Sequence, residues 1–213
     1  MKYWISILLL FSSYWGIGQA AKYLAAIPKY NEASAFEDIR YKDMDWSKFY
    51  KLDEANDIVD PMNYDFDLMN AAVFFAVNKY RSTKNIKAVA FEPRLRDAAC
   101  IHSYQMVKRK FFDHINHADP TIAYPNTRIE LCGYHGEKLS ENLARSYIDL
   151  TKPMNYTQVA DMVVKQLSQS PEHNLHMIDP ALDKLGCGFL FEYAPTEGMF
   201  YFRLTQDFGR DWR

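Results

Sequence analysis

The chain has 213 residues, enough for one domain of ordinary size and an extension. Hydrophobic residues make up 48% and charged residues 24%, a composition that supports a full globular core. The net charge of -2, without long runs of like charge, excludes the basic face that nucleic-acid-binding proteins need, so we expect no nucleic-acid partner.

The first twenty residues have the pattern of a signal peptide. Lys2 gives a charged start, residues 5–11 form a short apolar run, and the small residues Gly18 and Ala20 precede the expected cut after Ala20. The run is too short for a typical transmembrane span, although an uncleaved membrane-anchoring helix is the alternative interpretation. We therefore expect a secreted or periplasmic protein with no transmembrane anchor after processing.

Export permits disulfides, but the chain has only the cysteines Cys100, Cys132 and Cys187. At most one internal pair can form, and the sequence does not decide whether any two of them pair. Cys100 in a helix and Cys187 in an alternating strand are also typical of small buried thiols. A fold held together by many disulfides is excluded, so the hydrophobic core must stabilise the domain.

Residues 21–62 show no regular period, and acidic and aromatic residues alternate loosely along them. We interpret this stretch as an N-terminal extension that packs on the domain through Trp46, Phe49 and Tyr50. The alternative is a disordered acidic spacer, but such spacers seldom carry so many aromatic residues. The domain itself is expected to cover residues 63–213.

Two helices are expected at the start of the domain. Asp65 or Asp67 can cap the first, which continues to Arg81 with most of its surface apolar. The second begins near Pro93, and its apolar face is formed by residues at helical spacing: Leu95, Ala98, His102 and Met106. A histidine therefore points toward the core.

The next stretch, residues 114–136, loses its period and is expected to be a long loop. His114, His117, Cys132 and His135 have a spacing that permits a zinc site, but a loop of hydrogen-bonded histidines is the favoured interpretation.

A capping box of Asn155 and Gln158 predicts a further helix. Its apolar face also carries Gln166, which is expected to point inward. Two alternating stretches, residues 185–193 and 200–204, predict a closing antiparallel hairpin. Helices mostly first and strands mostly last indicate an α+β fold with helices covering a central sheet.

The chain resembles the CAP superfamily, which includes cysteine-rich secretory, antigen 5 and pathogenesis-related proteins, and in particular its bacterial SCP-domain type. The resemblance covers roughly residues 66–209 and rests on motifs that occur in the family's order: Asn-x-Tyr-Arg (78–81), His-Ser (102–103), Ser-Glu-Asn-Leu-Ala (140–144), Val-Ala-Asp-Met (159–162), Ser-Pro-x-His (170–173) and Leu-Gly-Cys-Gly (185–188). It implies an α-β-α sandwich whose central, mainly antiparallel sheet is flanked by helices.

In CAP domains two histidines and two glutamates line a cavity, and the histidines can bind a divalent metal. The matching motifs imply that the cavity candidates, catalytic or binding, are His102, Glu141 and His173, with His102 and His173 as metal ligands. The second glutamate falls on Gln166, which keeps an acceptor but carries no charge. Glu172 and His176 also depart from the bacterial pattern, and their roles stay open.

The resemblance favours a monomeric binding module for an apolar small molecule or for an envelope, cell-wall or other extracytoplasmic protein partner. Zinc or another divalent cation is expected to bind weakly, because two imidazoles supply half of a tetrahedral shell. The alternative is a metal-dependent, peptidase-like hydrolase with Glu141 as the general base. The sequence identifies neither the ligand nor a reaction.

Overall fold

The computed structural model describes residues 18–28, 30 and 32–212. Most of the predicted signal peptide lies outside the described residues, and only its last three residues belong to them. In chain order the elements are α2 (Arg40–Asp43), α3 (Trp46–Phe49), α4 (Asp53–Asn56), α5 (Phe66–Thr83), β1 (Ala90–Phe91), α6 (Pro93–Arg109), the 3-10 helix η1 (Pro120–Ile122), α7 (Pro125–Leu131), β2 (Lys138–Ile148), α8 (Tyr156–Ser168), α9 (Pro171–Ile178), β3 (Lys184–Ala194) and β4 (Met199–Arg210).

Within the described part of the chain, four strands form one sheet in the order β1-β3-β4-β2. The hairpin of β3 and β4 is antiparallel, β2 pairs antiparallel with β4, and the short β1 pairs parallel with β3. Gly198 lies in the hairpin turn with a φ of 65°, a left-handed conformation that favours glycine. The predicted hairpin and the mainly antiparallel sheet are confirmed.

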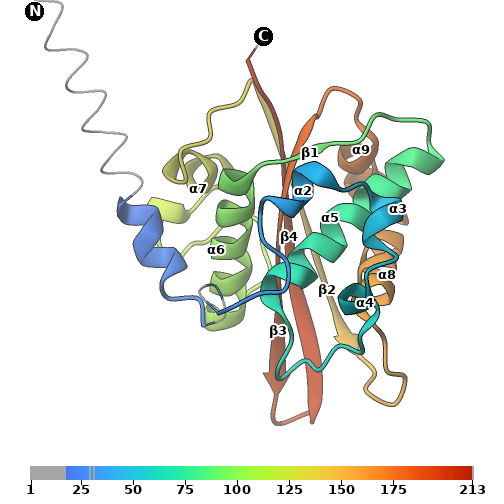
Figure 1. Cartoon of the computed structure of the whole chain (residues 1–213). Coiled ribbons are helices and arrows are strands. Elements are labelled where there is room, and N and C mark those ends of the chain that lie inside the picture. Colours follow the sequence, from blue (N-terminus) through green and yellow to red (C-terminus); the bar gives the residue numbers. More distant parts are fainter. Residues whose placement is uncertain (1–17, 29, 31, 213) are drawn as a thin grey trace, which may run out of the picture.

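Helices cover both faces of this sheet (Figure 1). On one side lie α6 and α7, and on the other lie α5, α8 and α9. The backbone of α6 lies directly on β3, because a Cβ at Gly186 would come within 1.9 Å of the Arg96 nitrogen, and one at Gly188 within 2.3 Å of the Cys100 nitrogen. The predicted α-β-α sandwich is therefore confirmed.

Helix starts follow local chemistry. The Asp65 side chain accepts a hydrogen bond from the Leu68 N–H at the start of α5, and Asn155 and Gln158 form the predicted capping box of α8. The expected long loop at residues 114–136 is wrong in part, since it contains η1 and α7. Each of these begins with a proline, which is pre-organised for a first helical position.

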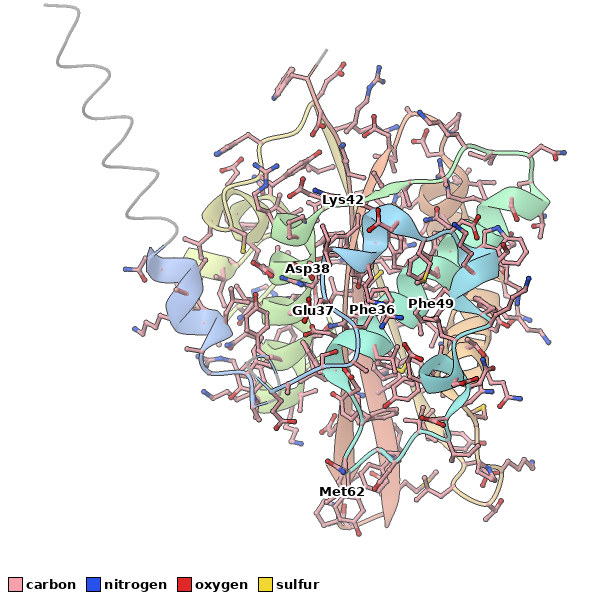
Figure 2. The ribbon with its side chains drawn as sticks, in the orientation of Figure 1. Phe36, Glu37, Asp38, Lys42, Phe49 and Met62 are labelled. Atoms are coloured by element: carbon pink, nitrogen blue, oxygen red, sulfur yellow. The ribbon has the colours of Figure 1, made fainter. Side chains whose placement is uncertain are left out.

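The segment of residues 32–62 crosses the front of the domain from the α6 side to α3 and α4 (Figures 1 and 2). Phe49 is fully buried, and its ring stacks on Phe75 of α5 with centroids 4.6 Å apart. The Tyr50 hydroxyl donates to Asp161 of α8 at 2.6 Å. Aromatic packing thus holds this segment on the domain, whereas the exact boundaries at residues 20 and 62 stay a prediction.

The described chain starts with helical residues 18–24, which lie beside α6 and α7 (Figure 1). Ala20 is buried there, and the Tyr23 hydroxyl donates to Asp119 at 2.8 Å. The cut after Ala20 stays a prediction. No helix among residues 18–28, 30 and 32–212 is both long and apolar enough to cross a membrane. The three cysteine thiols are buried and unpaired.

Candidate functional site

The stretch Ser140–Ala144 lies in β2, at the edge of the sheet where α9 and the chain after α6 approach it. Glu141 faces the α6 side and is paired in register with Asp207 of β4, so the two carboxyl groups are direct cross-strand neighbours. The Glu141 side chain is 2% exposed. The sequence therefore places a buried acidic pair at this edge.

Both oxygens of Glu141 accept hydrogen bonds from side-chain nitrogens. His114 Nδ1 lies 2.7 Å from Oε1, and Arg128 Nη2 lies 2.6 Å from Oε2. Arg128 is fully buried in α7 and also donates to three backbone carbonyls, of residues 114, 122 and 123. This arginine thereby fixes η1, α7 and the turn at His114 around the carboxylate.

The contacts set the protonation states of this pair. Burial alone would raise the pKa of Glu141, but the hydrogen bond from His114 and the charge of Arg128 outweigh it and lower the pKa. The hydrogen bond to Glu141 raises the pKa of His114, whose side chain is 48% exposed. Glu141 is consequently held as a carboxylate, and each of its two oxygens accepts one of these hydrogen bonds.

His102 lies beneath this network. It is fully buried on α6, as its helical phase predicted, and its Nε2 lies 2.9 Å from the backbone oxygen of Asp113. Burial lowers the pKa of His102 to about 4, so the imidazole is neutral. Its Nδ1 is buried without a hydrogen-bond partner. His102 therefore supports the turn that presents His114, and His114 is the histidine that touches Glu141.

His173 lies inside α9, because Ser170 and Pro171 begin a new helix. Burial, followed by the charges of His114 and His176, lowers the pKa of the half-buried His173. His176 Nδ1 lies 2.8 Å from the Asn142 side-chain oxygen, and the Asn142 amide donates to the His173 carbonyl at 3.0 Å. Asn142 thus ties α9 to β2. Glu172 is exposed and affects the pKa of His173 less than the two histidines do.

The Asn-x-Tyr-Arg motif fixes the other end of α9. Arg81 is buried and donates through Nη1 to the carbonyls of Met177 and Asp179, at 2.8 and 3.1 Å, and through Nη2 to that of Leu182. The Tyr80 hydroxyl donates to Asn174 at 2.8 Å. The helix that carries His173 and His176 is therefore held rigidly against the domain.

Asp207 is a site residue that sequence reasoning missed. Its carboxyl group is fully buried and lies within hydrogen-bond reach of the Glu141 carboxylate. Burial and the neighbouring charge of Glu141 raise the pKa of Asp207 well above its usual range, so the group is held protonated. The available signal was an acidic residue at an inward position of the alternating β4.

Gln166 does not point inward. Its side chain is exposed at the rim of α8, where the amide donates to the Arg145 carbonyl at 3.0 Å. The buried face of α8 is centred on Ala160, Val163 and Leu167, so Gln166 falls just outside it. The expectation that this residue enters the cavity is wrong.

The donor set fits a metal only in part. Among the described residues no group of three or more His, Cys, Asp or Glu side chains is arranged to hold a metal ion. His102 has no exposed surface, and one ring nitrogen already binds a carbonyl. His114 and His173 retain exposed surface and lie close enough for the charge of one to shift the pKa of the other.

Comparisons with known proteins agree with this fold. A model of the cysteine-rich secretory protein family, CAP, matches residues 74–208. An extracellular SCP-domain protein of Bacillus anthracis is 23% identical with a TM-score of 0.52; the match covers 68% of this chain but only 41% of that protein. An outer surface protein of Borrelia burgdorferi is 16% identical with a TM-score of 0.52, over 74% of this chain and 99% of that one. No curated protein matches the sequence.

Proposed function

We propose that this chain, which belongs to the CAP family of cysteine-rich secretory proteins, is an exported binding protein. The surface we assign to binding, called the β2-edge site, consists of His114, Glu141, His173 and His176. The two structural neighbours are described as an extracellular and an outer surface protein, which supports export. Such proteins meet their partners in the cell envelope or outside it.

The observation that supports a binding role over catalysis is that His114 and Arg128 hold Glu141 as a carboxylate inside the protein. A general base works best when its pKa lies near the working pH, because it must take up a proton there. Here both oxygens accept hydrogen bonds, from His114 at 2.7 Å and Arg128 at 2.6 Å, and the pKa of Glu141 is lowered. A carboxylate used in this way orients an imidazole and stabilises the fold. The metal-dependent hydrolase alternative gains no supporting observation.

The exposed part of the site favours a protein as the partner. Leu175 is 61% exposed on α9 and directly precedes the half-buried His176 in the chain. Burial and the charge of His114 lower the pKa values of both imidazoles, which are therefore neutral at pH 7. An exposed apolar side chain on the same short helix as two hydrogen-bonding imidazoles resembles the mixed surface of protein interfaces.

Zinc binding stays a prediction, and the geometry changes the proposed ligands. We propose His114 in place of His102 as the partner of His173, because His102 has no exposed surface. Two imidazoles leave half of the shell to water, so the affinity is expected to be low. In zinc calorimetry, His114→Ala and His173→Ala are expected to abolish the heat, whereas His102→Ala would abolish it instead if the sequence assignment is right.

Site-specific photo-crosslinking in cells that produce the protein tests the binding role. With the crosslinker at Leu175, we expect one discrete crosslinked protein. With the crosslinker at Ile58, which is equally exposed at 60% but lies on the N-terminal segment, we expect none. His173→Ala should weaken the product at position 175. The same products at both positions, or none at position 175, would contradict the proposal.

A further inference from the structure

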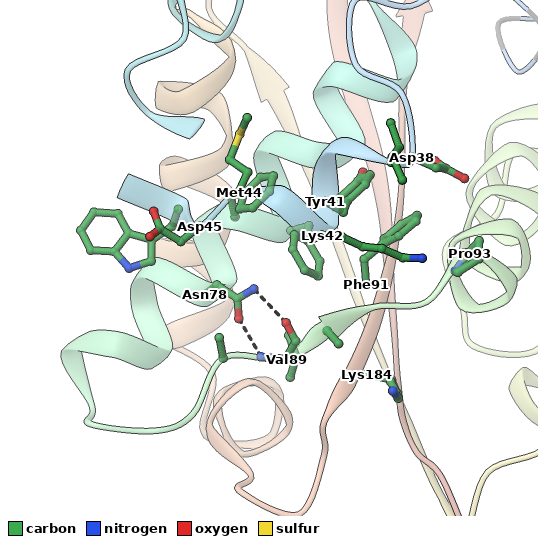
Figure 3. A pocket seen from close by; sticks show the side chains of 16 residues that line it. Asp38, Tyr41, Lys42, Met44, Asp45, Asn78, Val89, Phe91, Pro93 and Lys184 are labelled. Carbon is green, nitrogen blue, oxygen red and sulfur yellow. Dashed lines mark hydrogen bonds between the residues drawn. The ribbon is translucent and has the colours of Figure 1, made fainter. Parts of the chain in front are cut away.

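We infer that a second binding site lies between the N-terminal segment and the domain, and that it takes a small free organic anion with an apolar body. The cavity, called the extension pocket, lies beneath α2 and α3 and has a volume of about 730 Å³ (Figure 3). Small-molecule sites commonly enclose roughly 300–1,000 Å³. The inference goes beyond the proposed function, because none of the β2-edge site residues lines this cavity.

The walls of the extension pocket are aromatic and come from both parts of the chain. Phe74 of α5 and Phe91 of β1 belong to the domain, whereas Tyr41 and Trp46 belong to the N-terminal segment. The Tyr41 ring stacks on Phe91 with centroids 3.7 Å apart and meets Phe74 edge-on at 5.1 Å. Rings locked against each other in this way give a preformed apolar surface, as small-molecule sites have.

The polar side chain inside the pocket needs no hydrogen bond from a ligand. Asn78 lines it, but its side-chain oxygen accepts from the Val89 N–H at 2.9 Å and its amide donates to the Val89 carbonyl at 3.1 Å (Figure 3). Both hydrogen-bonding functions of this side chain are thus satisfied within the protein. The ligand body that fits here is therefore apolar.

The charges at the rim favour an anionic group. Asp38 accepts a hydrogen bond from Arg96, and Asp45 accepts from the Lys48 N–H as the N-cap of α3. Lys184 lies 3.1 Å from Asp211. Within the described ranges, the ammonium of Lys42 has no acidic partner, and it lies beside Tyr41 and Phe91 (Figure 3). The Asp45 carboxylate keeps its charge but lies on the opposite side of the pocket from Lys42 (Figure 3). The Lys42 ammonium beside the apolar walls is complementary to an apolar molecule with one negative group.

Two fluorescent dyes of similar shape test the assignment: 8-anilinonaphthalene-1-sulfonate, which is anionic, and N-phenyl-1-naphthylamine, which is neutral. We expect the protein to bind both. Lys42→Glu should weaken binding of the anionic dye about 3- to 10-fold and leave the neutral dye unchanged. Ala88→Trp places a large ring at a lining position and should remove both. Lys87→Glu, an exposed lysine that does not line the pocket, is the matched control and should behave as the parent.

Each other outcome overturns part or all of the inference. Dye binding that survives Ala88→Trp, in a variant whose melting curve matches the parent, would place the dye elsewhere and overturn the site. Equal weakening of both dyes by Lys42→Glu would overturn the anionic class. Binding to phosphatidylglycerol vesicles that is lost in Lys42→Glu, without binding of either dye, would replace the free ligand with a membrane surface. Crosslinking at Leu175 reports separately on the β2-edge site.

Discussion

The β2-edge site and the extension pocket are stabilised in opposite ways. At the β2 edge, the side chains of Arg128 and Glu141 are 0% and 2% exposed, and both carboxylate oxygens accept hydrogen bonds. In the extension pocket, stacked rings leave about 730 Å³ unfilled, and charges lie only at the rim. Buried polar groups must be saturated by fixed partners, whereas apolar walls tolerate an empty volume. The polar groups of the first site are therefore fixed by the fold, whereas the second site keeps a volume that a small molecule can fill.

The largest expected effect comes from opening the polar network. Glu141→Ala leaves Arg128 buried without its counter-charge and is expected to lower the free energy of unfolding by about 3–5 kcal/mol. Denaturant unfolding at pH 7 measures it. The matched control is Glu137→Ala, because that carboxylate is 42% exposed and pairs with Arg210 at 3.4 Å; it should cost below about 1 kcal/mol. A similar loss of unfolding free energy in both variants would contradict the expected difference between the buried and the exposed ion pair.

Asp207→Asn is expected to stabilise the protein, by about 1–3 kcal/mol at pH 8, because it replaces an acid that burial and the charge of Glu141 keep from ionising with a side chain that has no proton to lose. The folded-state pKa of Asp207 is raised, so its contribution is present below the ordinary carboxyl pKa near 4 and is lost as the pH rises. The gain should therefore shrink toward pH 4. Asp211→Asn should instead lower the free energy of unfolding, since Asp211 has a lowered pKa and pairs with Lys184.

Tyr50→Phe tests how the N-terminal segment is attached. The loss of the hydrogen bond to Asp161 is expected to lower the free energy of unfolding by about 0.5–1.5 kcal/mol. Cleavage by protease between residues 45 and 62 should become faster, because α3 contacts α5 through the same turn. Tyr147→Phe, at a tyrosine that is 53% exposed, is the control. Unchanged proteolysis in Tyr50→Phe would show that packing alone anchors the segment.

The smallest effect is expected at His114. Its raised pKa means that the stabilising contact with Glu141 is fully present below a pH near 6.5 and is lost as the pH rises through the raised value. Because the side chain is half exposed, His114→Gln should cost only about 0.2–1 kcal/mol at pH 6 and less at pH 9. NMR titration should show His114 titrating above the ordinary histidine pKa, and His102 staying neutral down to about pH 4.

Local signals in the sequence predicted the parts of the fold that depend on neighbouring residues. The cap at Asp65, the capping box at Asn155 and the β3-β4 hairpin need only a few adjacent positions, and all three are confirmed. The buried position of His102 also followed from helical spacing.

The contacts of the site depend on residues far apart in the chain, and spacing alone could not assign them. His114 reaches Glu141 because Lys110 ends α6 with a φ of 57°, and because Arg128 then holds the His114 carbonyl. Asp207 becomes part of the site only through the register of β2 on β4. Gln166 was expected to point inward, but it lies just outside the buried face of α8, so its side chain is exposed.

The pair of hydrogen bonds between Asn78 and Val89 has a consequence for how the protein behaves at high concentration. Val89 directly precedes β1, and the Asn78 amide bonds to its N–H and its carbonyl as a residue of a neighbouring strand would. Exposed strand edges are templates on which a second chain can add and start aggregation. One buried side chain therefore occupies the backbone groups of Val89 with which a second chain would have to pair at this position.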